Sequence, residues 1–337
     1  MKVLIGNSIS KGLRTGLTKS FPKKQQVRAS IGRFPSTEAF AEILDDVRGE
    51  AITIIQSIAA TKNQTANDYA VQLLLLIDTL KEYGAGPIWV IEPFAGYGRQ
   101  DKTRKGHHDS IACKSHARQL KNAGAVGFST IEMHSERGLN FHREQFGDAN
   151  VFNLDPTALL LKTLDIQDPS HVSVGGPDGS SDPRALKISK ATGASMFHTE
   201  KHRDVLETEI THFDGDVAGQ TADILDDMID RGSTTFDCGE YLDARKAKAI
   251  EAASTHMIGS ENSLEKLLTR RRADGRKRLF SRLIFSDTID QEEEINRLNF
   301  QYPGAARRIK IFTTADLLAQ HIKNDITNHP SMRPEPR

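Results

Sequence analysis

Three carboxylates and a small turn stand together in the segment 224–234, which reads Ile-Leu-Asp-Asp-Met-Ile-Asp-Arg-Gly-Ser-Thr. The apolar run 224–225 predicts a buried strand ending at Asp226. The turn 232–234 predicts the start of a helix, where backbone N–H groups can bind a phosphate. Carboxylates such as Asp226 and Asp227 accept hydrogen bonds from sugar hydroxyls or hold Mg²⁺. The segment therefore fits a ribose phosphate, although a solvated turn and helix cap use the same residue types.

A second candidate segment is the loop 94–102, which follows the strand-like run 88–91. Its glycines permit a tight path, and Arg99 and Lys102 offer two cations that match phosphate oxygens. A solvated basic loop is the alternative for the charges alone. The position at the carboxyl end of a strand favours ligand binding, because open α/β sheets bind ligands there.

Three more segments carry residues suited to metal or phosphate chemistry. His134 follows the predicted strand 126–133, and it is as compatible with a structural role as with a metal or phosphate contact. The small-residue loop 175–181 contains Asp178, which could hold Mg²⁺. The polar stretch 198–216 is typical of a flap that closes over developing phosphoryl charge.

Composition and charge restrict the class of protein. The 337 residues are 37% hydrophobic and 27% charged, which is enough chain for two globular domains. Lys+Arg 45 balance Asp+Glu 45, so no overall field favours nucleic acid or a membrane surface. Two cysteines make no disulfide framework. No signal segment is expected at 1–6, and the apolar run 71–77 is too short to span a membrane, so a cytoplasmic protein is expected.

Strand-like runs alternate with helical patterns, which predicts an α/β fold with mainly parallel sheets flanked by helices. Two halves of similar rhythm indicate domains at 1–150 and 151–327, followed by a frayed polar tail at 328–337. Strands are predicted at 3–5, 51–56, 88–91, 126–133, 171–174, 223–225, 279–285 and 309–312. Helices are predicted at 65–83, 110–123, 155–164, 182–192 and 233–252.

The order of these and other motifs resembles the ribose-phosphate pyrophosphokinase family over roughly the whole chain. The motifs that carry the resemblance are Gly6-Asn7, 32–38, 47–49, 54–57, 97–102, 133–136, Pro177-Asp178, 201–203, 215–219, 226–230, Thr255-His256 and 260–262. The resemblance implies two phosphoribosyltransferase-like domains. It also implies transfer of the β,γ-diphosphoryl group of ATP, with Mg²⁺, to the C1 hydroxyl of ribose 5-phosphate. A homo-oligomer, dimeric or hexameric, is expected.

Residue roles follow from the motif match. ATP contacts are expected at Phe34, Glu38, Arg99, Gln100 and Lys102. Contacts to the metal and its waters are expected at His134 and Asp178. Catalytic roles are expected for Lys201 and Arg203 on the flexible loop and for Asp230. The ribose phosphate is expected on Asp226, Asp227, Asp230, Arg231, Gly232, Ser233 and Thr234.

The chain also departs from the family pattern. Ser36-Thr37 stand where Asp-Gly is usual, Glu132-Met133 precede His134 in place of Asp-Leu, and 179–182 differ from the usual diphosphate loop. The usual phosphate loop is Asp-Thr-Gly-Gly-Thr, whereas 230–234 reads Asp-Arg-Gly-Ser-Thr. The extra cation leaves open an acceptor with a larger 5-substituent, such as ADP-ribose. The remaining alternative is a non-catalytic regulatory homologue. Such a protein would not require the cations and acids that this chain retains, so their presence argues against it.

Overall fold

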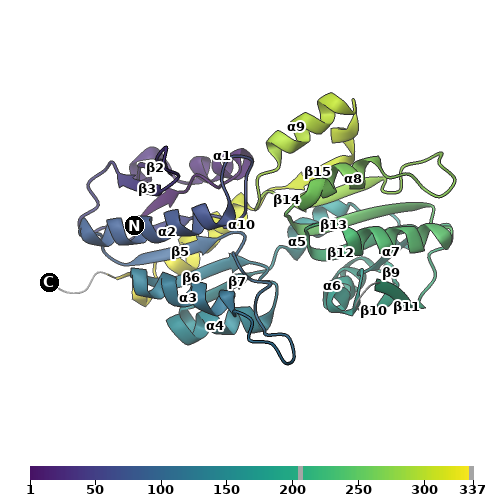
Figure 1. The fold of residues 1–337 in the computed structure, drawn as a ribbon, viewed down its shortest axis with the longest axis horizontal. Coiled ribbons are helices and arrows are strands. Elements are labelled where there is room, and N and C mark those ends of the chain that lie inside the picture. Colours follow the sequence, from purple (N-terminus) through teal and green to yellow (C-terminus); the bar gives the residue numbers. More distant parts are fainter. Residues whose placement is uncertain (204–207, 334–337) are drawn as a thin grey trace. The chain divides into compact units, whose positions relative to one another are not determined.

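Strands and helices alternate along the chain in the computed structural model, which describes residues 1–203 and 208–333, with the backbone alone for 201–203 and 208–210 (Figure 1). Two compact units result. Unit 1 comprises Met1–Asp155, Thr288–Asp290 and the chain from Thr313 onward, and unit 2 comprises Pro156–Asp287 and Gln291–Phe312. Each unit has its own parallel sheet flanked by helices, so the predicted α/β class is confirmed.

The sheet of unit 1 has five strands in the order β1-β4-β5-β6-β7, and every neighbouring pair is parallel. Its strands are β1 (Lys2–Ile5), β4 (Ile52–Ile55), β5 (Ile88–Glu92), β6 (Ala125–Ile131) and β7 (Val151–Leu154). Parallel strands end at the same edge of a sheet, so the loops after β5 and β6 leave from one edge. A separate antiparallel hairpin joins β2 (Ala29–Arg33) to β3 (Ala39–Ile43).

Helices cover both faces of this sheet. They are α1 (Lys11–Ser20), α2 (Ala66–Glu82), α3 (Ala112–Ala123), α4 (Glu136–Phe146) and α10 (Ala315–His321), the last continuing as a π-helical turn (Ile322–Ile326). Leu76 of α2 packs in the core cluster that contains Val90, whereas Leu17 of α1 and Leu318 of α10 pack in the cluster that contains Trp89. Neighbouring strand residues face opposite sides, so both faces of β5 are buried, and its residues 88–91 are apolar.

Unit 2 contains a parallel six-stranded sheet in the order β15-β14-β13-β12-β8-β9. Its strands are β8 (Val172–Gly175), β9 (Ser195–Met196), β12 (Thr221–Ile229), β13 (Ala249–Met257), β14 (Arg282–Ser286) and β15 (Ile309–Phe312). Its helices are α5 (Thr157–Leu164), α6 (Asp182–Thr192), α7 (Ser233–Ala244), α8 (Ser263–Thr269) and α9 (Glu292–Gln301). A two-stranded antiparallel ribbon, β10 (His198–Arg203) and β11 (Thr208–Asp214), occupies the predicted flap.

Several predicted boundaries in unit 2 were wrong, including the start of the strand predicted at 279–285, which begins at Arg282. The strand β12 does not end at Asp226 but runs to Ile229, because its pairing with β13 continues through Met228 and His256. The helix predicted at 233–252 ends at Ala244, and 249–257 form a strand instead. The alanines of that segment have high helix propensity, but Ala252 and Ala253 are buried in the middle of the sheet, and this packing outweighs local propensity.

The chain beyond Thr313 belongs to unit 1 and not to the predicted second domain at 151–327. Helix α10 lies close against α1, because a Cβ atom built on Gly16 would lie 2.4 Å from the Cβ of Ala315. The predicted frayed tail is also partly ordered. His329 Nε2 lies 2.9 Å from the Ala149 carbonyl oxygen, and Met332 is buried. Residues 334–337 of that tail lie outside the described chain.

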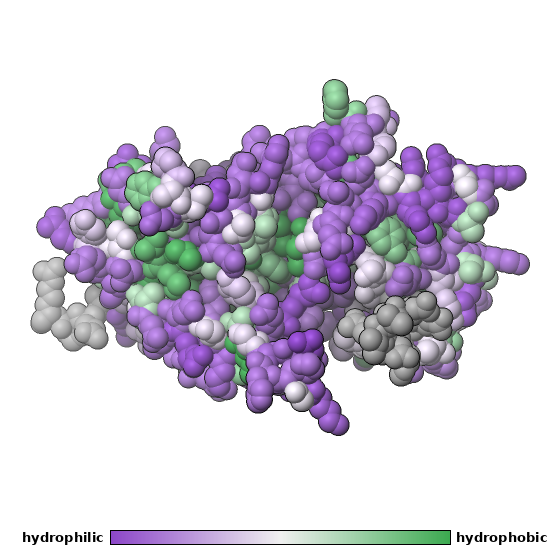
Figure 2. Space-filling model, in the orientation of Figure 1, coloured by the Kyte–Doolittle hydropathy of each residue, from purple (hydrophilic) through white to green (hydrophobic). Residues whose placement is uncertain are grey.

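Polar side chains dominate the face of the molecule drawn in Figure 2, in keeping with a chain that is 27% charged. Among the residues that the structure describes, no helix combines the length and the apolar character needed to cross a bilayer.

Candidate active site

The loop that follows β5 presents the predicted nucleotide contacts at the surface of unit 1. Arg99, Gln100 and Lys102 are exposed, and they follow the closely packed Gly96. A Cβ atom built on Gly96 would lie 2.3 Å from Ile58 Cγ2, so glycine is required there. A guanidinium and an ammonium from one short segment suit a polyphosphate.

His134 lies beside this loop at the same edge of the sheet. A Cβ atom built on Gly98 would lie 3.7 Å from the Cβ of His134. The next residue, Ser135, donates a hydrogen bond of 2.7 Å from its hydroxyl to Asp101 Oδ2, and it also caps α4. Unit 1 therefore places the predicted metal contact next to the predicted nucleotide loop.

The hairpin β2–β3 carries the other two predicted ATP contacts. The Phe34 ring is about half exposed and lies 5.0 Å from the Phe40 ring, measured between centroids. Glu38 Oε2 accepts a 2.7 Å hydrogen bond from the Ser36 hydroxyl. Thr37 has φ of 72°, in the left-handed region, so the departure from the usual glycine places a side chain on a strained backbone.

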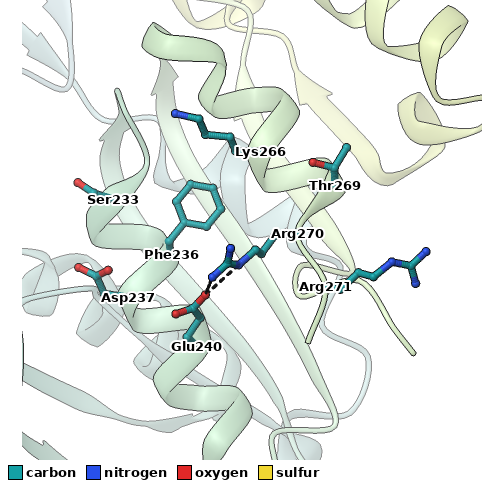
Figure 3. A pocket seen from close by; sticks show the side chains of 8 residues that line it. All are labelled: Ser233, Phe236, Asp237, Glu240, Lys266, Thr269, Arg270 and Arg271. Carbon is teal, nitrogen blue, oxygen red and sulfur yellow. Dashed lines mark hydrogen bonds and ion pairs between the residues drawn. The ribbon is translucent and has the colours of Figure 1, made fainter. Parts of the chain in front are cut away.

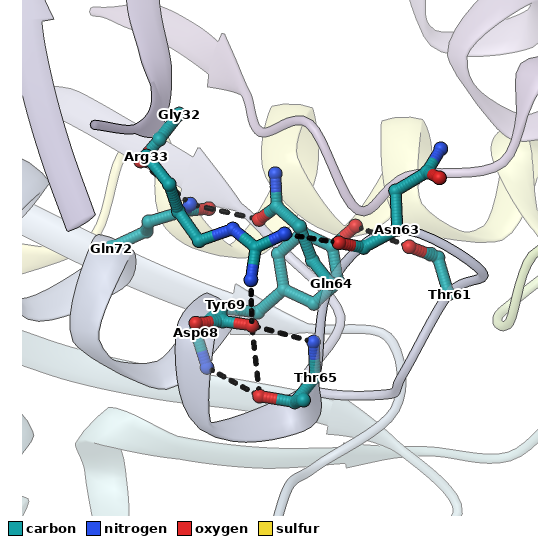
Figure 4. Close-up of polar contacts among 9 residues, drawn as sticks. All are labelled: Gly32, Arg33, Thr61, Asn63, Gln64, Thr65, Asp68, Tyr69 and Gln72. Atoms are coloured by element: carbon teal, nitrogen blue, oxygen red, sulfur yellow. Dashed lines mark hydrogen bonds and ion pairs between the residues drawn. The ribbon is translucent and has the colours of Figure 1, made fainter. Parts of the chain in front are cut away.

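A polar network at the start of α2 anchors that hairpin (Figure 4). Arg33 forms an ion pair of 3.3 Å with Asp68. Gln72 donates a 3.1 Å hydrogen bond to the Gly32 carbonyl oxygen. Thr65 and Asp68 complete a capping box, so the same carboxylate begins the helix and holds the hairpin.

The acidic pair of unit 2 lies inside β12. Asp226 Oδ1 accepts hydrogen bonds from the Asp227 N–H at 2.9 Å and from the Ser181 hydroxyl at 3.2 Å. Burial and the neighbouring Asp227 carboxylate raise the pKa of Asp226 to about 7, with smaller effects of Arg184 and Asp178. The site therefore holds concentrated negative charge, which a cation or hydroxyl donors would stabilise.

Asp178 faces this acidic pair from the loop after β8. Its side chain accepts a 3.1 Å hydrogen bond from the Ser180 N–H, which fixes the carboxylate at the start of a 3₁₀ turn. Among the side chains that the structure describes, those of 1–200 and 211–333, no three His, Cys, Asp or Glu residues form a metal cage. Mg²⁺ on a nucleotide keeps several waters and takes one or two carboxylates together with phosphate oxygens. Asp178 and Asp226 therefore fit such an ion without a protein cage.

The predicted phosphate loop joins β12 to α7. Gly232 is the N-cap of α7 with φ of 76°, and a glycine brings no side chain to cover the first-turn N–H groups. Those N–H groups and the helix dipole favour an anion. Arg231 is exposed and lies 3.9 Å from the Glu261 carboxylate, measured from NH1 to Oε1. Its guanidinium is thus available at the rim of the loop.

An open pocket of about 590 Å³ adjoins the phosphate loop (Figure 3). Helix α7 and the end of α8 supply its lining residues: Ser233, Phe236, Asp237, Glu240, Lys266, Thr269, Arg270 and Arg271. The Arg270 guanidinium binds Glu240 across the pocket, with a 2.9 Å hydrogen bond from Nε to Oε1. The pocket has enough volume for a substituent larger than one phosphate, and Ser233 is shared with the loop.

The predicted catalytic cations Lys201 and Arg203 lie in β10, and their side chains lie outside what the structure describes. The base of β10 is fixed to the Asp178 loop, because the Thr199 hydroxyl donates a 2.8 Å hydrogen bond to the Gly176 carbonyl oxygen. His198 forms an ion pair of 2.8 Å with Asp182, and this partner raises the pKa of His198.

Sequence reasoning missed several residues that hold these groups in place. Ser181 bonds Asp226, and Thr199 fixes the ribbon. Under the nucleotide loop, Glu92 and His116 form a buried pair. Each is a polar residue of a common type to which no motif assigned a role, so only the fold reveals these partnerships.

Comparison with known proteins leads to the same family that the sequence motifs resemble. Residues 2–124 match a family described as the N-terminal domain of ribose phosphate pyrophosphokinase. The chain is 30% identical over 338 aligned residues to the ribose-phosphate pyrophosphokinase of Buchnera aphidicola subsp. Schizaphis graminum, covering 98% of this chain and 97% of that protein. It is 32% identical to that of Chromobacterium violaceum over 71% of each chain. The phosphoribosylpyrophosphate synthetase of Mycobacterium smegmatis shares the fold, with a TM-score of 0.81, 24% identity, and coverage of 97% and 99%.

Proposed function

The chain belongs to the ribose-phosphate pyrophosphokinase family, and we propose that it makes phosphoribosyl pyrophosphate and AMP from ATP and ribose 5-phosphate. The C1 hydroxyl oxygen forms a bond to the β-phosphorus of ATP and loses its proton. The bond between that phosphorus and the α–β bridging oxygen breaks, and AMP leaves. The observation that carries the proposal is the near-complete match in length to these relatives. It is supported by the acidic pair near the end of β12, a strand that leads into the predicted phosphate loop and α7.

In this proposal unit 2 binds the acceptor. Asp226 and Asp227 accept hydrogen bonds from the ribose diol, and the first turn of α7 binds the 5-phosphate through backbone N–H groups. The raised pKa of Asp226 supports this role, since hydroxyl donors relieve the repulsion between the two carboxylates. Asp230 closes the acceptor site at the start of the loop.

Unit 1 binds ATP in the same proposal. Arg99, Gln100 and Lys102 contact the nucleotide from the loop after β5, whereas Phe34 and Glu38 contact adenine from the hairpin. Mg²⁺, when bound with ATP, neutralises charge on the phosphates. His134 and Asp178 are each a residue that would hold the ion or its waters.

Lys201 and Arg203 supply positive charge to the transferring group. Phosphoryl transfer depends mainly on positioning and on stabilising charge that develops on phosphorus oxygens. The hydrogen bond from Thr199 to the Gly176 carbonyl oxygen supports this role, since it fastens the base of β10 to the loop that carries Asp178.

Product analysis tests the proposal. Protein, ATP, Mg²⁺ and ribose 5-phosphate are incubated, and nucleotides are separated by chromatography. We expect AMP in a one-to-one ratio with phosphoribosyl pyrophosphate. Accumulation of ADP with a monophosphorylated sugar would show transfer of a single phosphoryl group and reject the proposal.

ADP-ribose is a second candidate acceptor. Two observations favour it: the exposed Arg231 at the rim of the phosphate loop and the pocket of about 590 Å³ that shares Ser233 with the loop. A second phosphate could pair with Arg231, while the pocket accommodates the attached nucleoside. The same assay with ADP-ribose in place of ribose 5-phosphate decides between them.

A further inference from the structure

A buried carboxylate lies directly beneath the nucleotide loop. Glu92 is the last residue of β5 and is fully inaccessible to solvent. A buried carboxylate requires hydrogen-bond donors. His116 of α3 provides one, with Nε2 at 2.6 Å from Oε1. The Gly96 N–H donates the other, at 3.1 Å to Oε2.

The backbone that Glu92 holds is in an unfavourable conformation. Tyr97 follows Gly96 directly and has φ of 60°, in the left-handed region that bulky residues seldom adopt. Such a conformation persists only where surrounding contacts fix it. The Tyr97 ring packs 5.3 Å from the His116 ring, between centroids, and its hydroxyl donates a 2.8 Å hydrogen bond to Asn67.

Two more hydrogen bonds hold the same loop further along the chain. The Gln100 carbonyl oxygen accepts a hydrogen bond from the Cys113 N–H at the start of α3. Asp101 is buried and accepts from Ser135. Arg99 and Gln100 therefore project from a backbone held at both ends, and Glu92 provides the anchor on the β5 side.

We propose that the Glu92–His116 pair is a positioning device for ATP: it fixes the backbone at Gly96 and so sets where Arg99, Gln100 and Lys102 meet the nucleotide. The inference rests on the proposed function, because it assumes that this loop binds ATP. Neither Glu92 nor His116 touches the nucleotide in this arrangement, so both act through the loop. Their loss should change ATP use selectively.

The main test variant replaces both partners, Glu92→Leu with His116→Leu. Exchange of a buried polar pair for apolar side chains of similar volume often leaves stability intact, whereas removal of one partner leaves a buried charge alone. The Gly96 N–H loses its acceptor in this variant. We expect kcat/KM for ATP to fall roughly ten- to a hundredfold, as for a displaced binding group, with the KM for ribose 5-phosphate unchanged.

Two single variants sharpen the test. Glu92→Gln keeps an oxygen that can accept from Gly96, so it should retain most of the ATP efficiency. Tyr97→Phe removes only the partly exposed anchor to Asn67 and leaves the core untouched. It keeps the proposal testable if the double variant fails to fold, and we expect a rise of about threefold in the KM for ATP from one lost hydrogen bond.

Ser129→Ala is the matched control. The Ser129 hydroxyl is also buried in unit 1, where it accepts a 2.8 Å hydrogen bond from Trp89 Nε1 and contacts His321, away from the loop. It should leave both KM values unchanged. A folded double variant or Tyr97→Phe with wild-type ATP kinetics overturns the proposal, as does a control that raises the KM for ATP as much. If the wild type releases no AMP at all, the proposed function fails instead.

Discussion

Lys201 is the residue for which we expect the largest kinetic effect. A cation on the ribbon should act on charge that develops in the transition state, so its loss should lower kcat and leave ATP binding nearly unchanged. By analogy with a lost oxyanion-hole donor, Lys201→Ala should reduce kcat by about 10²-fold or more. Steady-state kinetics with saturating ribose 5-phosphate measures this. Lys190→Ala, on the exposed face of α6, is the control. An unchanged kcat removes Lys201 from the mechanism.

Arg231 separates the two acceptors. If the acceptor carries a diphosphate, Arg231→Thr should lower kcat/KM for ADP-ribose about ten- to a hundredfold, since a charge-assisted contact is worth roughly 1.5–3 kcal/mol. The KM for ATP should stay the same. If ribose 5-phosphate is the acceptor, the substitution should have little effect, because Arg231 already lies at the exposed rim near Glu261. Arg276→Thr, on an exposed turn, controls for loss of surface charge.

Among individual residues, the sequence predicted those site side chains that follow a strand in a loop of small residues. His134 and Asp178 are examples, because each follows a predicted strand and therefore lies at the carboxyl edge of its own sheet. The sequence did not predict a role for Glu92 or His116. Nothing in the sequence reports that a strand-ending carboxylate is fully buried, or that a histidine 24 positions later meets it.

At the element scale, the start of α2 allows a stability prediction. The Thr65 hydroxyl accepts a hydrogen bond from the Asp68 N–H at 3.2 Å and donates one of 2.9 Å to Asp68 Oδ2. Thr65→Ala should lower the free energy of unfolding by about 1 kcal/mol, as for other lost N-caps. Urea unfolding followed by the fluorescence of Trp89, the one tryptophan of the chain, measures it. Thr103→Ala on an exposed loop should have no effect.

The boundaries of elements were less predictable than their presence. Helix α6 was predicted at its observed bounds, since an acidic first turn and a following glycine mark its ends. The end of β12 was predicted three residues too early. Polar residues within a strand resemble a turn, and only the pairing with β13 shows that the strand continues through Asp226 and Asp227.

The division of the whole chain between the two units was the feature that the sequence predicted least well. Alternating strands and helices suffice for two α/β units, but not for the return of the chain to unit 1 after Thr313. That return depends on a close helix contact between Gly16 and Ala315, residues that lie almost 300 positions apart in the chain. Small apolar residues at such a distance leave no local pattern.

The stability of unit 1 should depend on pH through a buried histidine. His142 is inaccessible to solvent, its ring stacks 3.9 Å from Phe128, and its Nδ1 lies 2.9 Å from the Gly138 carbonyl oxygen. Burial lowers the pKa of His142 to about 4. The folded-state pKa thus lies below the ordinary value of about 6.5, so the unfolded chain takes up the proton first. Stability should therefore be full above about pH 6.5 and decline as the pH falls toward 4, by at most roughly 3 kcal/mol.

His142→Gln isolates this contribution, because an amide can still donate to the Gly138 carbonyl oxygen but cannot ionise in this range. Burial also lowers the pKa of His321, which adds a loss in the same direction, so the wild type and the variant must be compared at each pH. The raised pKa of Asp226 acts in the opposite direction in unit 2. Unfolding free energies from Trp89 fluorescence between pH 4.5 and 8 should converge for the two proteins as the pH falls. Parallel curves would mean that His142 has the same pKa in the folded and unfolded states, which would contradict the prediction.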